Sequence, residues 1–408
     1  MASCRFCGSA LQYTFVDLGT TPLANNFLMP AQLSQMEPFY PLHAYVCDRC
    51  FLVQLDAVVA PEDIFSDYPY FSSYAQSWLQ HAKTYADKAV KRFALSRESR
   101  VIEIASNDGY LLQYFVAMGI PVLGIELAAN IADAALKKGI ATVVKFFGEQ
   151  AARELVAQNG GADLLIGNNV LAHVPQLNDF VRGMKILLKP RGVITMEFPH
   201  LLRLMEGNQF DTIYHEHFSY FSLITVEKVF LAHGLTIFDV EEIPTHGGSL
   251  RIYVRHAEDT ATPVGSRVAE LLAREEAAGL TQLEHYQSFG ERVKETKREI
   301  LDFLIRAKRE GKSIAGYGAP AKGNTLLNYC GIRSDFIDYT VDVSPHKQGQ
   351  YLPGTRIPIH PLEKIKETKP EYVLILPWNL RDEVMSQHAY IREWGGRFII
   401  PIPTVEVM

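Results

Sequence analysis

Two Cys-x-x-Cys pairs near the N-terminus constrain the fold of this chain more than any other sequence feature. Cys4 and Cys7 form the first pair, Cys47 and Cys50 form the second, and Cys330 stands alone. A gap of two residues lets both thiolates of a pair point at one ion, and two pairs complete a tetrahedral site. We therefore predict a structural Zn²⁺ with four sulfur ligands and no open position, in preference to buried free thiols or a redox pair.

The rest of the 408-residue chain alternates short apolar runs with helix-length stretches, a pattern typical of parallel sheets with crossover helices. The predicted strands of a central domain span residues 100–104, 121–126, 163–167 and 192–198. A charged helical stretch at 266–309 leads to a smaller Rossmann-like unit, whose predicted strands span 312–318, 337–342 and 371–376. The predicted fold is α/β, with a zinc-binding domain at 1–80, a central Rossmann-like domain at 81–245 and a C-terminal Rossmann-like domain at 246–408.

Composition disfavours several classes of function. The formal net charge of −6 argues against a dedicated nucleic-acid binder, which is usually basic. No run of roughly 18 apolar residues is present, so we expect no membrane span. The N-terminus lacks a charged leader followed by an apolar stretch, which favours a cytoplasmic protein. The chain has no heptad pattern or apolar surface stripe, so we expect a monomer.

A turn after the first predicted strand of the central domain is a candidate ligand site. Its sequence is Glu103-Ile-Ala105-Ser-Asn107-Asp108-Gly109. Such turns place backbone N–H groups and a helix N-terminus against a ligand. Only Gly109 remains of the glycines that admit a dinucleotide pyrophosphate, so the turn favours S-adenosylmethionine, which carries no phosphate.

Two later strand ends extend this candidate site. Glu126 closes the second strand, where a carboxylate can bind a ribose diol; an exposed strand-end charge is the alternative. A pair of asparagines follows the third strand, ahead of His173, and a Leu-Lys-Pro-Arg-Gly segment at 188–192 precedes the fourth. This order resembles the class I S-adenosylmethionine methyltransferases. The predicted cofactor-binding residues are Glu103, Ala105, Asn107, Asp108, Gly109, Glu126, Leu127, Asn168 and Asn169.

The segment Tyr214-His215-Glu216-His217-Phe218 concentrates titratable and hydroxyl side chains. Its spacing is not the His-Glu-x-x-His of zinc proteases. In an extended segment, Tyr214 and Glu216 would face one way and the two histidines the other. A histidine oriented by a carboxylate or hydroxyl can take a proton from carbon next to a carbonyl. We therefore favour a catalytic role for this segment over a set of capping or core residues.

Motifs along the whole chain occur in an order that resembles the sugar C-methyltransferases, which make branched deoxysugars. They are the two cysteine pairs, the Asp-Tyr-Pro-Tyr-Phe-Ser-Ser stretch at 67–73, the turn at 103–109, the Tyr-His-Glu-His-Phe segment, the His-Gly-Gly-Ser-Leu-Arg stretch at 246–251 and the Gly-Tyr-Gly-Ala-Pro-Ala-Lys-Gly-Asn stretch at 316–324. The resemblance implies a zinc-binding domain, a methyltransferase domain and a C-terminal Rossmann-like domain. It further implies methylation at C3 of a nucleotide-diphosphate 4-keto-6-deoxysugar.

The resemblance also implies catalytic roles. His217 would remove the C3 proton, with Glu216 orienting it. Tyr214 and His173 would stabilise the enolate oxygen or hold the sugar. One tyrosine of the 67–73 stretch would close over the site, and the sequence does not decide between Tyr68 and Tyr70.

The glycine-rich stretch at 316–324 offers backbone N–H groups and one cation, a combination that can cradle a diphosphate. A tight turn that needs glycine only for packing is an equal alternative. Arg251 could pair with a phosphate, although a lone arginine on a strand is more often a surface charge. The predicted substrate-binding residues are Arg251, Tyr317, Lys322 and Asn324.

Three other functions remain open from the sequence. They are an O- or N-methyltransferase of the same build, a non-enzymatic zinc- and nucleotide-binding protein, and an NAD oxidoreductase that uses the third segment. The last is disfavoured because the Gly316-x-Gly318 pair lacks its third glycine at the expected step.

Overall fold

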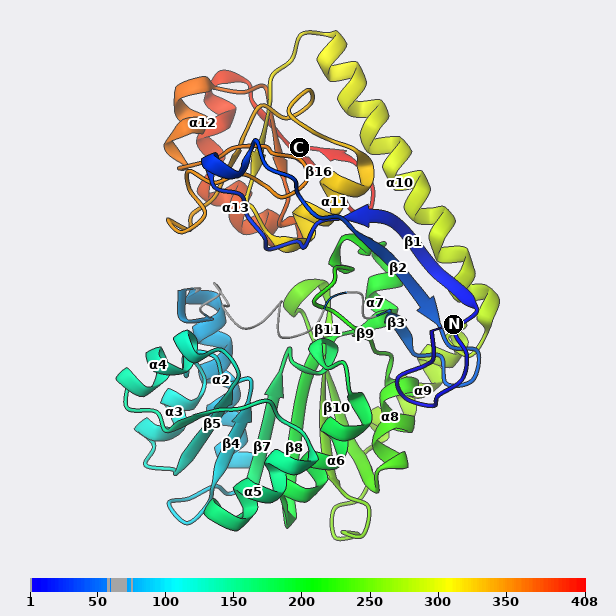
Figure 1. Ribbon diagram of the computed structural model, residues 1–408, viewed down its shortest axis with the longest axis vertical. Coiled ribbons are helices and arrows are strands. Elements are labelled where there is room, and N and C mark those ends of the chain that lie inside the picture. The colour runs from blue at the N-terminus through cyan, green and yellow to red at the C-terminus, as the bar shows by residue number, and fades with distance from the viewer. Residues whose placement is uncertain (1, 57–58, 60–71, 75) are drawn as a thin grey trace.

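The computed structural model describes residues 2–56, 59, 72–74 and 76–408, and the strands within them form three sheets. In Figure 1 the seven-stranded sheet lies in the lower half of the molecule and the six-stranded sheet in the upper half. The four-stranded sheet lies along the long helix at the right of that view. This three-part α/β architecture confirms the predicted fold class. No helix among the described residues has the length and apolar character needed to cross a bilayer.

The central sheet has the strand order β10-β11-β8-β7-β4-β5-β6. Its strands are β4 (Val101–Ile104), β5 (Val122–Glu126), β6 (Thr142–Val144), β7 (Ala162–Asn168), β8 (Leu188–Pro199), β10 (Leu235–Ile243) and β11 (Ser249–His256). Pairing is parallel from β6 to β8, and β10 and β11 are antiparallel additions. The chain runs outward from β4 to β6 and then returns to β7 on the other side of β4. Ligands of such sheets bind at the carboxyl ends of the strands where the order reverses.

Both faces of the central sheet are buried, as its continuous apolar strands predict. Val101 and Leu164 pack into one core and their neighbours Ile102 and Leu165 into the other, so the period of two fixes the register. One face is covered by α2 (Gln76–Arg92), α3 (Leu112–Ala117) and α4 (Ala129–Lys137). The other is covered by α5 (Glu149–Asn159), α6 (Leu177–Leu187) and α8 (Leu223–Ala232).

The N-terminal sheet has the order β1-β2-β3-β9, and its last strand comes from the middle of the chain. The strands are β1 (Tyr13–Thr21), β2 (Tyr40–Val46), β3 (Val53–Leu55) and β9 (Ser219–Tyr220). Val53 pairs with Tyr220 and Gln54 with Ser219. The segment that carries the four cysteines is therefore completed by a strand that directly follows the Tyr-His-Glu-His-Phe segment.

The C-terminal domain contains a mixed sheet of order β14-β13-β12-β15-β16-β17, in which only the β16–β17 pair is antiparallel among the described strands. The strands are β12 (Ile314–Tyr317), β13 (Thr340–Val341), β14 (Ile359–His360), β15 (Tyr372–Ile375), β16 (Arg397–Ile400) and β17 (Glu406–Val407). Its principal helices are α11 (Ala321–Cys330), α12 (Glu363–Thr368) and α13 (Arg381–Gln387).

The predicted helical connector is two helices, α9 (Ser266–Ala277) and α10 (Leu283–Arg309). The break between them includes Gly279, which has a φ of 92°. Buried side chains of α10 recur at helical spacing, and the ring of Phe289 stacks on Phe15 of β1 with centroids 4.6 Å apart. This helix therefore joins the C-terminal domain to the N-terminal sheet.

Candidate active site

A cavity of about 520 Å³ lies at the carboxyl ends of β4 and β7, where the strand order of the central sheet reverses. All three parts of the chain line it. Asn25 comes from the N-terminal segment, Glu126 and His217 from the central domain, and Lys322 from the C-terminal domain. The volume falls within the range of roughly 300–1,000 Å³ that is usual for small-molecule sites.

The turn after β4 adopts left-handed backbone conformations with only one glycine. The φ angles of Ala105, Asn107 and Gly109 are 55°, 49° and 76°. The Asn107 side chain accepts a hydrogen bond from the Ser72 N–H at 2.8 Å. A Cβ atom on Gly109 would lie 2.2 Å from Ile140 Cδ1, so a side chain there would force Ile140 to move. The turn therefore has the shape of a glycine-rich loop while presenting Ala105 and Asn107 to the cavity.

Glu126 ties this turn to the end of β5. Its carboxylate accepts hydrogen bonds from the N–H groups of Asn107, Leu127 and Ala128 at 2.9, 2.8 and 3.0 Å. Burial raises the pKa of Glu126, and the three backbone donors oppose that shift. Because Glu126 and Leu127 also line the cavity, the predicted strand-end carboxylate faces the ligand site and is not an exposed surface charge.

Six of the nine predicted cofactor-binding residues line the cavity. Those that line the cavity are Ala105, Asn107, Glu126, Leu127, Asn168 and Asn169. Glu103, Asp108 and Gly109 do not line it. Glu103 is fully enclosed, and burial, reinforced by Glu126, raises the pKa of its carboxyl group well above the usual range. Asp108 forms an ion pair with Lys138 at 2.8 Å.

The histidine-rich segment forms a turn rather than an extended strand. The His217 N–H donates to the Tyr214 carbonyl at 2.9 Å, so the side chains do not alternate as predicted. Tyr214, Glu216 and His217 all line the cavity with His173, whereas His215 points toward Pro41 of the N-terminal segment. Four predicted catalytic side chains are therefore gathered in one place. Tyr68 and Tyr70, the other two predicted residues, lie outside the described residues.

The surroundings of His217 fix its tautomer. Its Nδ1 lies 2.9 Å from the Thr212 carbonyl oxygen, which can only accept a hydrogen bond, so Nδ1 carries the proton and Nε2 is left with a lone pair. Its ring centroid lies 4.1 Å from that of Tyr214 and 4.7 Å from that of His173. Burial, reinforced by His173, lowers the pKa of His217 well below its usual value. Burial likewise lowers the pKa of His173 to about 4. Both rings are therefore neutral at pH 7, as a base must be before it takes a proton.

Lys322 is the predicted substrate-binding residue that reaches the cavity. Its ammonium group bonds to the Asn379 side chain and lies 4.6 Å from the centroid of the Trp378 ring. Burial lowers the pKa of Lys322 to about 8, and the nearby carboxyl of Asp211 opposes that shift. Because burial removes part of the water around this cation, an anionic group of a ligand would be a favourable partner for it at the cavity wall.

Three other predicted substrate-binding residues have different partners, and none of these described side chains lines the cavity. Arg251 is buried and pairs with Glu197 at 2.6 Å, which also rules out the surface-charge alternative. The Tyr317 hydroxyl lies 3.0 Å from His388 Nε2. Asn324 donates to the Ala24 carbonyl at 2.6 Å. These three side chains bond to interior groups and do not line the cavity in this structure, and their contact with a substrate stays a prediction.

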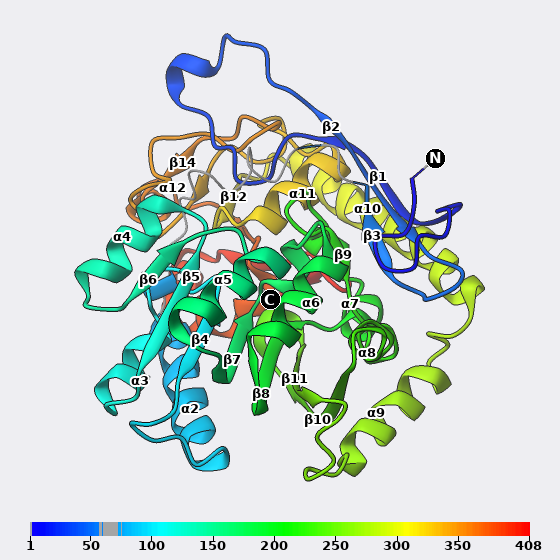
Figure 2. The same cartoon turned by 60° about the horizontal axis from the view of Figure 1, so that its bottom comes forward.

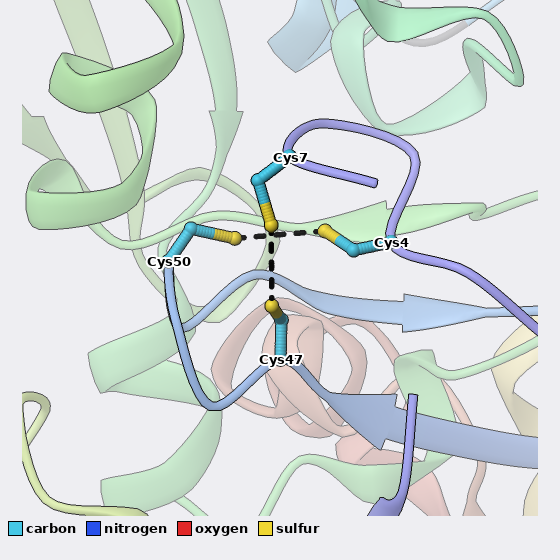
Figure 3. Close-up of side chains that lie close together, drawn as sticks. All are labelled: Cys4, Cys7, Cys47 and Cys50. Carbon is cyan, nitrogen blue, oxygen red and sulfur yellow. Dashed lines mark hydrogen bonds between the residues drawn. The ribbon is translucent and has the colours of Figure 1, made fainter. Parts of the chain in front are cut away.

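The four paired cysteines form the predicted metal site, and Figure 3 shows their sulfur atoms converging on one point. The Sγ atoms all lie within 4.8 Å of one another, with 3.6 Å between Cys4 and Cys50 and 3.5 Å between Cys7 and Cys47. A tetrahedral ion with Zn–S bonds of about 2.3 Å requires S···S separations of about 3.8 Å. The Gln54 amide donates to Cys4 Sγ at 3.2 Å, as suits a thiolate. The donor set fits Zn²⁺, whereas a disulfide needs about 2.05 Å between sulfurs.

Several cavity-lining residues were not found from the sequence. His246 lines the cavity with a φ of 55°, and the two glycines after it were a signal of a tight turn. Its Nε2 lies 3.4 Å from Asn169 Nδ2, and burial lowers the pKa of His246 to about 4. Trp78 stands beside it, with ring centroids 5.4 Å apart. Asn25 gave no signal, because nothing in its local sequence distinguishes it from a loop asparagine.

Three family models match consecutive parts of the chain. A "Putative zinc binding domain" matches residues 4–65, a "Methyltransferase domain" matches 78–240, and a "C-methyltransferase C-terminal domain" matches 244–403. A curated relative, C-methyltransferase NovU of Streptomyces niveus, is 37% identical over 405 residues, which is 99% of this chain and 96% of the relative.

Solved structures overlap with part of the chain. A protein of Pyrococcus horikoshii OT3 is 16% identical and covers 46% of this chain and 96% of its own, with a TM-score of 0.38. The magnesium protoporphyrin IX methyltransferase of Synechocystis PCC 6803, solved with bound SAH, is 16% identical and covers 43% of this chain and 82% of its own, with a TM-score of 0.35.

Proposed function

Because the chain belongs to the C-methyltransferase family, we propose that it methylates C3 of a nucleotide-diphosphate 4-keto-6-deoxysugar. The protein is an S-adenosylmethionine-dependent methyltransferase with a four-cysteine zinc site. The sugar, the position of the new methyl group and the roles of individual residues are parts of the proposal.

The proposed reaction begins with loss of a proton from carbon. A 4-keto group makes the neighbouring C3–H bond acidic, and Nε2 of His217 takes the proton while the electron pair moves into an enolate. The enolate carbon then forms a bond to the methyl group, and the sulfonium of S-adenosylmethionine, which supplies an activated methyl, leaves as a neutral thioether. The chain's main contribution to the second step is in-line positioning, since the methyl group needs no further activation.

The observation that carries this proposal is the fixed tautomer of His217 at the cavity wall. A neutral imidazole with Nδ1 bonded to Thr212 can use only Nε2 as a base. Tyr214 and His173 flank the ring and would hold the substrate or stabilise the enolate oxygen. Glu216 lines the same wall and would orient the substrate or the base.

The nucleotide end of the substrate has a candidate partner in Lys322. This cation lies on the cavity wall at the start of α11, on the side of the C-terminal domain. A diphosphate beside it would gain an ionic hydrogen bond. The cofactor would occupy the end of the cavity formed by the turn after β4, Glu126 and the asparagines that follow β7.

A panel of nucleotide-linked 4-keto-6-deoxysugars tests this function. With S-adenosylmethionine, mass spectrometry should find a gain of one methyl group, and NMR should place it on carbon. In deuterated water without cofactor, the protein should exchange the C3 proton; His217→Ala should abolish exchange, and His285→Ala, remote from the cavity, should not. A methyl on C5, which the same ketone acidifies, would overturn the C3 assignment. A methyl on oxygen or nitrogen would overturn C-methylation of these sugars.

A further inference from the structure

An arm of the chain between β1 and β2, residues 22–39, leaves the N-terminal sheet and follows the C-terminal domain. Figures 1 and 2 both show this segment beside that domain. Leu28 and Tyr351 exchange backbone hydrogen bonds at 3.0 and 2.9 Å, and the Gly354 N–H donates to the Glu37 carboxylate at 2.6 Å. The arm is therefore held in place by residues that do not line the cavity.

Asn25 of this arm reaches the cavity and the catalytic segment. Its Nδ2 donates to Oε1 of Glu216 at 2.6 Å, a contact between residues 191 positions apart. Both side chains line the cavity. The preceding residue, Ala24, is fixed by the Asn324 amide at 2.6 Å, so α11 of the C-terminal domain sets the position from which Asn25 reaches Glu216.

The geometry points to Asn25 as a positioning residue of the active site, one that holds the Glu216 carboxylate against the cavity wall. This inference rests on the proposed function, in which Glu216 orients the reacting groups. An amide N–H can only donate, so it binds the carboxylate as an acceptor and restricts the rotation of that side chain. Glu216 directly precedes His217, and both belong to the turn that the His217 N–H closes on Tyr214.

The arm does not need the Asn25 side chain for its own path. Its backbone is fixed on one side by Asn324 and on the other by the pairing of Leu28 with Tyr351. Both neighbouring anchors, Ala24 and Leu28, are buried apolar residues, which is the usual means of docking a segment. A polar side chain between them, directed into a cavity and paired with a carboxylate, is better explained by the active site than by the docking of the arm.

Substitution of Asn25 tests this role, with the exposed neighbour Asn26 as a matched control. For Asn25→Ala we expect kcat for methyl transfer to fall about 10- to 100-fold, the factor that corresponds to one hydrogen bond to a charged group. Solvent exchange of the sugar proton should fall by a similar factor. The KM for the sugar and the Kd for S-adenosylmethionine should stay within about threefold of wild type. Asn26→Ala should leave all four quantities unchanged.

Asn25→Asp separates positioning from packing. It has nearly the same shape but places a second carboxylate against Glu216, so its kcat should lie below that of Asn25→Ala. If Asn25 had only a structural role, the kcat of Asn25→Asp would lie above that of Asn25→Ala. Equal kcat for wild type and Asn25→Ala, an equal fall in Asn26→Ala, or higher activity in Asn25→Asp than in Asn25→Ala would overturn the inference.

A double-mutant cycle tests the contact without a substrate. The losses in melting temperature of Asn25→Ala and Glu216→Ala should sum to more than the loss of the double variant, because they break the same hydrogen bond. Full additivity would refute the contact. If the wild-type protein methylates no nucleotide sugar in the panel, the proposed function fails, and the cycle still decides whether Asn25 positions Glu216.

Discussion

Replacement of Arg5 by methionine should loosen both the zinc site and the cofactor cavity. Arg5 lies between the ligands Cys4 and Cys7, and its guanidinium bridges β3 of the N-terminal sheet and the central domain. It donates to the Leu55 carbonyl and, at 3.4 Å, to the carbonyl of Pro175, which lines the cavity. Burial lowers the pKa of Arg5 to about 10, so it stays charged at pH 7.

The contacts of this guanidinium determine how much stability the substitution should cost. Hydrogen bonds from a charged donor contribute about 1.5–3 kcal/mol each, and the stack 5.4 Å above the Phe218 ring adds about 0.5–1 kcal/mol. The bond to Pro175 is long, and methionine keeps the packing of the stem, so we expect a net loss of about 3 kcal/mol. The removed positive charge also faces a zinc–thiolate group that is net negative, which favours earlier loss of the metal.

Two assays measure these effects. A chromogenic chelator follows the release of zinc in urea, and titration calorimetry measures the binding of S-adenosylmethionine. Arg5→Met should release zinc at a lower urea concentration and bind the cofactor at least about fivefold more weakly, the lower end of usual coupling between sites. Arg49→Met is the matched control, because Arg49 lies inside the second cysteine pair but is exposed; its effect should stay within about 0.5 kcal/mol. Equal shifts in the two variants, or an unchanged cofactor Kd in Arg5→Met, would refute the reasoning.

Three further outcomes follow from the cavity and the metal site. Because burial lowers the pKa of His217, kcat/KM should stay level as the pH falls through 6.5 and decline only at lower pH; a decline centred at or above pH 6.5 in the pH–rate profile would contradict this. Glu126→Ala should weaken S-adenosylmethionine binding by about 10-fold or more in calorimetry, while Glu98→Ala, an exposed control, should leave the Kd unchanged. Elemental analysis should find one zinc per chain in wild type and in Cys330→Ser, since that thiol lies in the C-terminal domain, and none in Cys47→Ser.

The features that the sequence predicted correctly are those with a short-range physical signature. The cysteine pairs and the apolar strands of the central domain each satisfy a spacing rule that holds wherever the elements pack. The position of Glu126 at the cavity was predictable because a strand end in a parallel sheet has a fixed place relative to the preceding turn. Even the glycine-poor turn was recognisable, although the sequence did not reveal that Ala105 and Asn107 adopt left-handed conformations.

The sequence did not show which polar groups pair with one another in the assembled fold. Arg251 was predicted as a possible partner of a phosphate, and the structure pairs it in the interior with Glu197 on the adjacent strand. The alternation expected around His215 failed because a turn, closed by the His217 N–H, replaces the strand. Asn25 could not be found at all, since its role depends on an arm whose path is set by the C-terminal domain. Local patterns predict elements, whereas the pairing of a buried polar group is decided by the assembled fold.

The segment at 213–218, which carries the proposed base His217, is bonded to the N-terminal sheet and to the C-terminal part of the chain. At its start, the Ile213 carbonyl accepts a hydrogen bond from Thr325 of α11 at 3.1 Å. At its end, the Phe218 carbonyl accepts from the Leu55 N–H at 3.1 Å, and β9 then completes the sheet of the zinc module. The central domain supplies contacts of its own, among them the bond from the Phe218 N–H to the Ala172 carbonyl at 2.7 Å and the bond between His217 Nδ1 and the Thr212 carbonyl at 2.9 Å. A base must be held within a fraction of an ångström of its working position, so the proposed role of His217 would depend on the flanking domains as well as on the central one. The four cysteines do not line the cavity, yet the metal they hold stabilises the sheet that β9, directly after this segment, completes.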